Sequence, residues 1–183
     1  MAAVCVFCAS SRTLEPAWLD LAAGVGAEIA RRGHVLVSGG GRVGMMGAVA
    51  DGVRSAGGHT LGVIPQCLVD WEVADTKADE LIVTDDMGSR KNLMIARSDA
   101  FITLPGGLGT LDELFEVWTT AMLGVHRKPI VLLDPDNFYE GMLAWLGKLA
   151  DTEFVRRPAL EVVTVGGTIP AAFEALESSA TAR

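Results

Sequence analysis

The chain has 183 residues, half of them hydrophobic, and a formal net charge of −8. This acidic balance argues against nucleic-acid polymers and membrane surfaces as partners, because basic proteins bind both. No apolar run approaches the ~20 residues of a membrane span, and residues 1–8 lack the basic start of a signal peptide. We therefore expect a cytoplasmic protein with a single domain over residues 1–177 and a disordered tail over 178–183.

Apolar runs that alternate with helical patterns predict a parallel α/β sheet. In chain order, strands are expected at 2–8, 34–37, 59–64, 81–84, 100–104, 129–133 and 161–165. Helices are expected at 16–32, up to residue 56, at 87–97, at 111–122, at 138–149 and at 170–177, and residues 65–80 are expected to form a loop or a short helix. Because the strands are continuously apolar, helices should cover both faces of the sheet.

The cysteines and histidines do not predict a metal site. Three cysteines, an odd number, fit reduced thiols. Cys5 and Cys8 form a CxxC pattern, but this spacing within a strand directs them to opposite faces, and no second pair completes a site. The three histidines are scattered and show no ligand spacing.

The chain has more apolar residues than one core needs, and this surplus is expected to form a subunit interface.

The stretch from Leu104 to Glu113 joins the expected fifth strand to the next helix. Its sequence, Leu-Pro-Gly-Gly-Leu-Gly-Thr-Leu-Asp-Glu, leaves backbone N–H groups free at a helix start, with the helix dipole behind them. The glycines let an anion approach the backbone because no Cβ stands in the way. The pattern predicts a phosphate site, although the spacing and the lysine of a P-loop are absent.

Glu113 has two interpretations at this stage. Thr110-x-x-Glu113 matches a capping box, in which the glutamate closes the start of its own helix. Alternatively, the carboxylate contacts another part of the ligand. A bound phosphate would repel a carboxylate this close to it, so a second interaction should compensate for the repulsion. A sugar on that phosphate develops positive charge as its glycosidic bond breaks, and the carboxylate would stabilise that charge.

A second glycine motif runs from Gly39 to Gly44. It matches G-x-G-x-x-G, which is typical of dinucleotide binding, but it follows the second strand, and residues 59–66 contain no acid for a ribose hydroxyl. The glycines could instead allow tight packing between strand and helix. A third alternative, favoured by Arg42, is a ligand-facing loop.

Arg90 and Lys91 lie at the start of an expected helix, where cations oppose the helix dipole. One explanation is pairing with Asp85 or Asp86. The other is a shared anionic ligand, because the carboxyl ends of parallel strands meet at one edge of the sheet. That edge should gather residues 10–11, 39–41, 87–91 and 106–110.

These motifs together resemble the Lonely Guy (LOG) phosphoribohydrolases, cytokinin-activating enzymes once widely labelled lysine decarboxylases. The resemblance covers residues 4–165. It rests on Leu104-Pro-Gly-Gly-x-Gly-Thr-x-x-Glu113, Ser38-Gly-Gly-Gly-x-x-Gly-x-Met-Gly47, Gly62-Val-Ile-Pro65, Arg90-Lys91 and Leu123-Gly-x-His-x-Lys-Pro129.

The resemblance implies a Rossmann-like, doubly wound, three-layer α/β fold with about seven strands, in a homodimer. It also implies hydrolysis of an adenosine 5'-monophosphate, plain or N6-prenylated, to free base and ribose 5-phosphate, with no metal and no cofactor. Arg90 and Glu113 would be catalytic. The residues implied to bind the nucleotide are Glu72, Arg90, Lys91, Gly107, Leu108, Gly109, Thr110, Leu111, Asp112, Glu113 and Thr119.

The chain departs from the family pattern at three places. It has Ala9-Ser10-Ser11 for Gly-Ser-Ser, Gly88-Ser89 for His-Glu, and Thr119-Thr120-Ala121-Met122 for Thr-Trp-x-Gln. These changes bear on the preferred base and the rate. Two other functions stay open: a carrier that binds a nucleotide or cofactor without turnover, and a lysine decarboxylase, which would need a lysine for pyridoxal phosphate.

Overall fold

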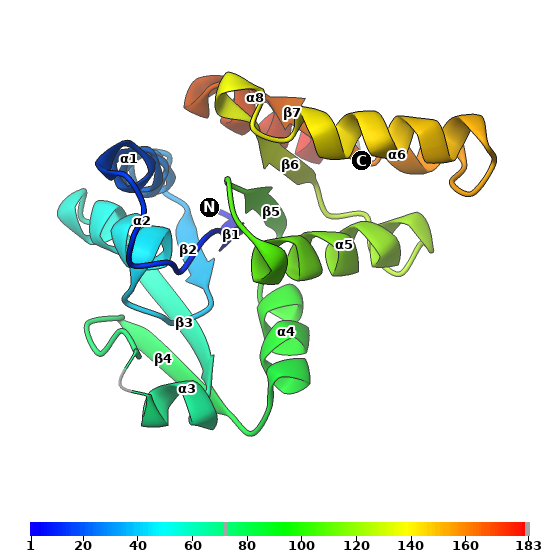
Figure 1. The fold of residues 1–183 in the computed structure, drawn as a ribbon. Helices are drawn as coiled ribbons and strands as arrows, with labels where there is room; N and C mark the ends of the chain where they lie inside the picture. The colour runs from blue at the N-terminus through cyan, green and yellow to red at the C-terminus, as the bar shows by residue number, and fades with distance from the viewer. Residues whose placement is uncertain (72, 182–183) are drawn as a thin grey trace.

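The computed structural model describes residues 1–71 and 73–181, with no side-chain description beyond residue 179. One parallel sheet of seven strands runs through the molecule, with helices on both faces (Figure 1). The strands are β1 Ala3–Phe7, β2 Val35–Ser38, β3 His59–Pro65, β4 Glu80–Thr84, β5 Ala100–Thr103, β6 Ile130–Leu133 and β7 Val163–Gly166. The helices are α1 Pro16–Arg31, α2 Gly44–Ser55, α3 Gln66–Asp70, α4 Met87–Ala96, α5 Leu108–Met122, the 3-10 helix η1 Pro135–Asn137, α6 Glu140–Asp151, α7 Arg157–Leu160 and α8 Ile169–Thr181.

The strand order is β4-β3-β2-β1-β5-β6-β7. The chain builds outward from β1 to β4, then returns through α4 to place β5 on the other side of β1. Cys5 therefore pairs with Val37 on one side and with Phe101 on the other. This reversal is the switch point at which doubly wound folds bind ligands, beyond the carboxyl ends of the strands.

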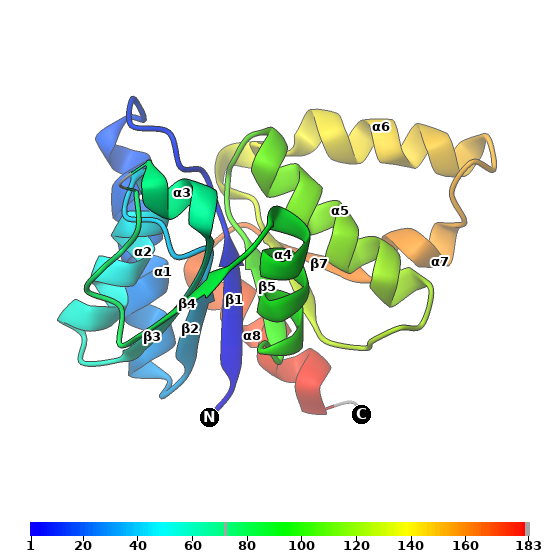
Figure 2. The ribbon, with the colours of Figure 1, turned by 90° about the horizontal axis from the view of Figure 1, so that it is seen from below.

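Two apolar cores flank the sheet. One lies under α1, α2 and α8 and contains Val4, Val6 and Ile102, and the other lies under α4, α5 and α6. Cys8 belongs to the first core and Cys5 to the second, so the strand does direct the two thiols to opposite faces. Figure 2 shows α1 and α2 on one side of the sheet and α4 and α5 on the other. The predicted three-layer α/β fold is confirmed.

The expected elements differ from the structure mainly at their ends. The segment predicted as a loop or a short helix contains α3. The short helices α7 and η1 were not predicted, because three or four residues are too few to show a helical repeat of apolar side chains. Helix α8 runs to Thr181 and so includes residues 178–181 of the predicted tail. Residues 182 and 183 lie outside the described residues, and disorder of the tail stays a prediction. Within the described residues, no helix has the length and apolar character to cross a membrane.

Candidate active site

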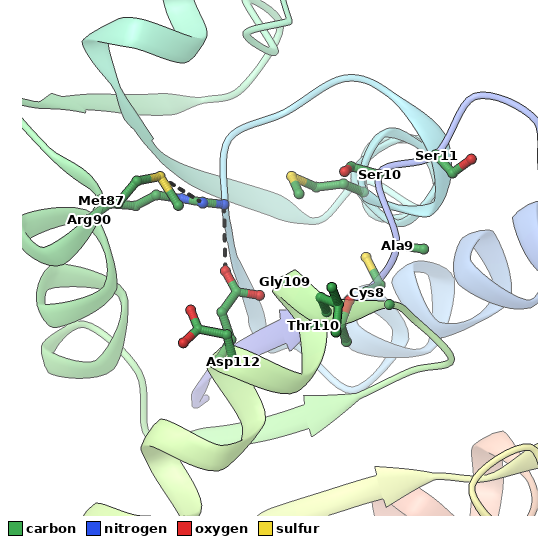
Figure 3. Close-up of a pocket in the computed structure, with 13 residues that line it drawn as sticks. Cys8, Ala9, Ser10, Ser11, Met87, Arg90, Gly109, Thr110 and Asp112 are labelled. Carbon is green, nitrogen blue, oxygen red and sulfur yellow. Dashed lines mark hydrogen bonds and ion pairs between the residues drawn. The ribbon is translucent and has the colours of Figure 1, made fainter.

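A cavity of about 400 Å³ opens at the carboxyl edge of the sheet, beyond β1 and β5 (Figure 3). Its walls come from the loop after β1, the start of α2, the start of α4 and the start of α5. The lining residues are Cys8 to Ser11, Met46, Met87, Arg90, Gly107 to Thr110, Asp112 and Glu113. The structure thus brings residues 10–11, Arg90 and most of the predicted phosphate loop together.

The start of α5 offers free backbone amides to this cavity. The N-cap residue is Gly107, which has no side chain to accept a hydrogen bond. Because the amides of the first turn of any α-helix have no intrahelical partner, they are left for a ligand here. A Cβ added at Gly107 or Gly109 would meet no atom within 4 Å, so the backbone there is open to a ligand. A Cβ at Gly106 would lie 2.2 Å from Oγ1 of the buried Thr110, which explains the glycine at that position. An anion fits this helix start.

Two hydrogen bonds anchor the loop that leads into α5. The Leu104 amide donates to the Phe7 carbonyl at 2.9 Å. The Tyr139 hydroxyl, which is buried, donates to the Leu104 carbonyl at 2.7 Å. Tyr139 was not identified from the sequence, because a tyrosine near a helix start carries no signal of a distant loop contact.

Glu113 does not form a capping box. Because the cap is Gly107, Thr110 and Glu113 lie inside α5, and the capping interpretation is wrong. The Glu113 side chain is 12% exposed. Burial raises its pKa to about 7, although the nearby charge of Arg90 acts in the opposite direction. A carboxyl with this pKa exchanges a proton readily at neutral pH.

Arg90 is a buried cation that faces this carboxyl. Its Nη2 lies 3.6 Å from Oε1 of Glu113 (dashed line in Figure 3). The guanidinium also donates through Nε to the Val63 carbonyl at 3.2 Å and through Nη2 to the Gly39 carbonyl at 3.3 Å. The predicted catalytic residues therefore lie side by side, on two different helices.

The second glycine motif is explained by close packing. A Cβ at Gly39 would lie 1.8 Å from Nη2 of Arg90, and a Cβ at Gly44 would lie 2.6 Å from the Ser11 carbonyl oxygen. Gly44 also has a φ of +61°, which favours glycine. These glycines thus make room for the cavity wall, which accounts for them without a dinucleotide. Arg42 is exposed and does not line the cavity.

Lys91 lies outside the cavity. Its Nζ contacts Asp112 at 3.0 Å and Glu116 at 2.7 Å, both on α5, and the hydrogen bond with Glu116 raises its pKa. The alternative in which Asp85 or Asp86 pairs with Arg90 or Lys91 is not seen; Asp86 instead caps α4 by accepting from the Ser89 amide.

Other predicted binding residues also lie away from the cavity. Thr119 shares a shallow groove with Lys91 on the outer side of α5. Leu111 packs against the core under α5. Glu72 lies outside the described residues. For all of these, nucleotide binding stays a prediction.

The sequence analysis missed the sulfur-containing side chains of the cavity. Met46, Met87 and Cys8 line it, and burial raises the pKa of the Cys8 thiol. Such residues are common in cores, so no spacing marks them as part of a site. Across residues 1–71 and 73–181, no group of three His, Cys, Asp or Glu side chains is placed to hold a metal ion.

Comparison with known proteins places this site in a family. The family model described as "Possible lysine decarboxylase" matches residues 46–176. The chain is 54% identical over 176 residues to a cytokinin riboside 5'-monophosphate phosphoribohydrolase of Mycobacterium tuberculosis, which covers 96% of this chain and 94% of that protein. The chain belongs to the LOG family.

The LOG relationship extends to plants and to a solved structure. A phosphoribohydrolase of the same name from Arabidopsis thaliana is 43% identical over 160 residues, covering 87% of this chain and 74% of the plant protein. The structure of a molybdenum cofactor binding protein from Rippkaea orientalis aligns with a TM-score of 0.73 and 26% identity, over 97% of this chain and 96% of that one. The LOG-family fold thus also occurs in a protein named for binding a cofactor.

Proposed function

We propose that this chain hydrolyses the N-glycosidic bond of an adenosine 5'-monophosphate, plain or N6-prenylated, to free base and ribose 5-phosphate. The observation that carries the proposal is the buried pair of Glu113 and Arg90, 3.6 Å apart, in a cavity that also contains the free amides of α5. The names of the bacterial and plant relatives support the same reaction.

The geometry suggests an order of positions for the nucleotide. The phosphate binds at the amides of residues 107–110, and Ser10 and Ser11 line the same cavity. Glu113 lies one helical turn further along α5, so the ribose bonded to that phosphate would face its carboxylate. Holding the phosphate in this way orients the sugar before reaction.

The reaction then needs a negative group beside the sugar. As the bond from C1' to the base nitrogen breaks, positive charge develops on the ribose, and the Glu113 carboxylate stabilises it. Water forms the new bond to C1'. One of its protons passes to the Glu113 carboxylate, and Glu113 then gives a proton to the departing base, so the carboxylate is regenerated and the net change is addition of water across the bond. Arg90 holds the carboxylate in place and balances its charge.

The apolar part of the cavity suits the base. Met46 and Met87 have flexible thioether side chains, which adapt to flat rings and to apolar substituents. Both a purine and an N6-prenyl group would find an apolar wall there. This accommodation favours adenine nucleotides over strongly polar bases.

A homodimer is also part of the proposal. Leu108, Leu123 and Val125, at the two ends of α5, are 88%, 67% and 72% exposed. Large apolar side chains in such positions are typical of subunit contacts.

The proposal is tested by identifying products. The purified protein is incubated with AMP, isopentenyladenosine 5'-monophosphate, GMP and CMP, and free base and ribose 5-phosphate are quantified by chromatography. We expect equal amounts of both products from the adenine nucleotides. Adenosine and isopentenyladenosine serve as controls and should not react, because they lack the phosphate. Absence of base from every monophosphate would contradict the proposal.

A second candidate is a carrier that binds its ligand without turnover. The fold match to the molybdenum cofactor binding protein favours this alternative. Native mass spectrometry of the protein with the same nucleotides distinguishes the two. Retained intact nucleotide with no released base would support the carrier.

Decarboxylation, as in the family description, has less support. The chain has four lysines, Lys77, Lys91, Lys128 and Lys148. All four lie in the described part of the chain, and none lines the cavity. Lys91 is paired with two carboxylates, and the Lys128 Nζ donates to the Ile95 carbonyl. A pyridoxal absorption band in the purified protein would revive this function.

A further inference from the structure

An ion pair between a half-buried arginine and a buried aspartate lies outside the cavity lining and takes no part in the site as described. Nη1 of Arg54, on α2, contacts Oδ2 of Asp75 at 2.7 Å. Asp75 is only 5% exposed and lies in the connection between α3 and β4. Neither residue lines the cavity. Burial of the Asp75 carboxylate costs solvation energy, so the contact with Arg54 is what keeps this charge in the connection; the Arg54 side chain itself is 21% exposed and also contacts Asp51 at 2.7 Å.

The segment that carries Asp75 pairs with the glycine loop. The Asp75 amide donates to the Gly40 carbonyl at 2.8 Å, and the Arg42 amide donates to the Val73 carbonyl at 2.8 Å. Between them, Gly41 and Ala74 form an antiparallel bridge. The Asp75 carboxylate accepts a further bond from the Lys77 amide at 3.1 Å, which fixes its orientation.

The glycine loop in turn positions Arg90. The Gly39 carbonyl accepts a hydrogen bond from Nη2 of Arg90, the same nitrogen that lies 3.6 Å from Glu113. A run of three glycines has little conformational preference of its own, and Gly40 has a φ of +69°. The place of the Gly39 carbonyl therefore depends on the contacts of the loop: the Gly40 amide donates to Oγ of Ser38, the Gly41 amide to Sδ of Met46, and the Gly40 carbonyl accepts from the Asp75 amide.

We infer that Asp75, held by Arg54, is a positioning residue for the hydrolysis: it fixes the loop Gly39–Gly41 so that the Gly39 carbonyl presents the Arg90 guanidinium to Glu113. The inference rests on the proposed function. Asp75 acts through backbone contacts and touches neither the nucleotide nor the reacting atoms.

The test is Asp75→Asn, which keeps the size and the backbone amide but removes the charge paired with Arg54. For wild type and variant, kcat and KM for isopentenyladenosine 5'-monophosphate are measured between pH 5 and 9, together with Tm. We expect kcat to fall roughly tenfold, with a smaller change in KM, because a small displacement of a catalytic group lowers the rate. The acid limb of the kcat profile should move to higher pH, because the charge of Arg90 opposes protonation of Glu113.

Two further variants keep the result interpretable. Glu177→Gln removes the contact of 2.8 Å between Glu177 of α8 and Arg32, the residue that follows α1; neither residue lines the cavity. It should lower Tm without moving the acid limb. Asp75→Glu retains the charge and should restore part of the kcat and the original limb. Where Asp75→Asn does not fold, Arg54→Gln, which removes the other charge of the pair, takes its place with the same expectations.

The outcomes separate the two proposals. Base release by wild type, with the kcat and acid limb of Asp75→Asn unchanged, would overturn the positioning role even if Tm fell. No base release by wild type from any nucleotide would overturn the proposed function and this inference with it.

Discussion

Two neighbouring cations of α4 face carboxylates of α5, and they do so in different ways. Arg90 is buried and stands 3.6 Å from Glu113, in the cavity. The next residue, Lys91, makes contacts of 3.0 and 2.7 Å with Asp112 and Glu116, on the outer side of α5. One step along the chain therefore separates a loose, buried pair from a tight, partly exposed one.

The difference shows in the titration of the charged groups. In the outer pair, contact with Glu116 raises the pKa of Lys91, so the lysine stays charged at neutral pH. In the inner pair, burial raises the pKa of Glu113 to about 7 despite Arg90. A close ion pair favours the charged carboxylate, whereas a buried and loosely paired one is poised to exchange a proton. The inner pair is thus suited to chemistry and the outer pair to joining two helices.

The largest effect is expected from Glu113→Gln. The change keeps the shape of the side chain but removes the negative charge beside the ribose, so kcat should fall by roughly 1,000-fold. Nucleotide binding, measured by calorimetry, should be largely retained. Glu116→Gln is the matched control, because it removes a carboxylate one turn further along the same helix. Equal losses in both variants would erase the contrast between the two pairs.

A second prediction concerns stability and pH. The folded state binds a proton on Glu113 more tightly than the unfolded chain, because burial raises the pKa from 4.5 to about 7. Wild type therefore loses stability as the pH rises through this range, by roughly 3 kcal/mol when the loss is complete. Glu113→Gln carries no such penalty. It should be more stable than wild type at pH 8, and most of that advantage should be gone at pH 5.

Urea denaturation at both pH values checks this expectation. An advantage of the same size at pH 5 and pH 8 would mean that the titration of Glu113 is not its cause.

The activity of the wild type should rise as the pH passes about 7, whereas its stability falls, because the carboxylate form is the one that stabilises the ribose.

The smallest effect is expected from Lys91→Gln. Its contacts with Asp112 and Glu116 are partly solvated, so their loss should cost about 1 kcal/mol of unfolding free energy or less. The value of kcat should stay within about fivefold of wild type. A rise of KM by more than about tenfold would instead support the predicted role of Lys91 in binding the nucleotide.

Much of the site could be predicted from sequence, because its parts follow from local rules. The loop from Leu104 to Glu113 lies at the end of a buried strand, and the topology of a parallel sheet then brings Arg90 to the same edge. The capping-box pattern misled because the helix starts at Leu108, three residues after Pro105, rather than after Thr110. The spacing of Thr110 and Glu113 fits a helix that begins at either place, so it does not determine the first residue of the helix.

The remaining features depend on contacts between distant segments. The partners of Lys91 are on α5 rather than at Asp85 or Asp86, and that choice follows from how α4 packs beside α5. Likewise, Tyr139 reaches Leu104 across 35 positions of the chain. The positions of Leu111 and Thr119 on the flanks of α5 depend on the rotation of the helix, which a motif does not specify.

The close approach at Gly39 has an evolutionary consequence. A methyl group at this position and the guanidinium of Arg90 would occupy the same volume, since only 1.8 Å would separate them. A larger amino acid at position 39 therefore requires the Arg90 guanidinium to move away from the Gly39 carbonyl, so lineages that replace this glycine should hold the cation of the cavity in a different place.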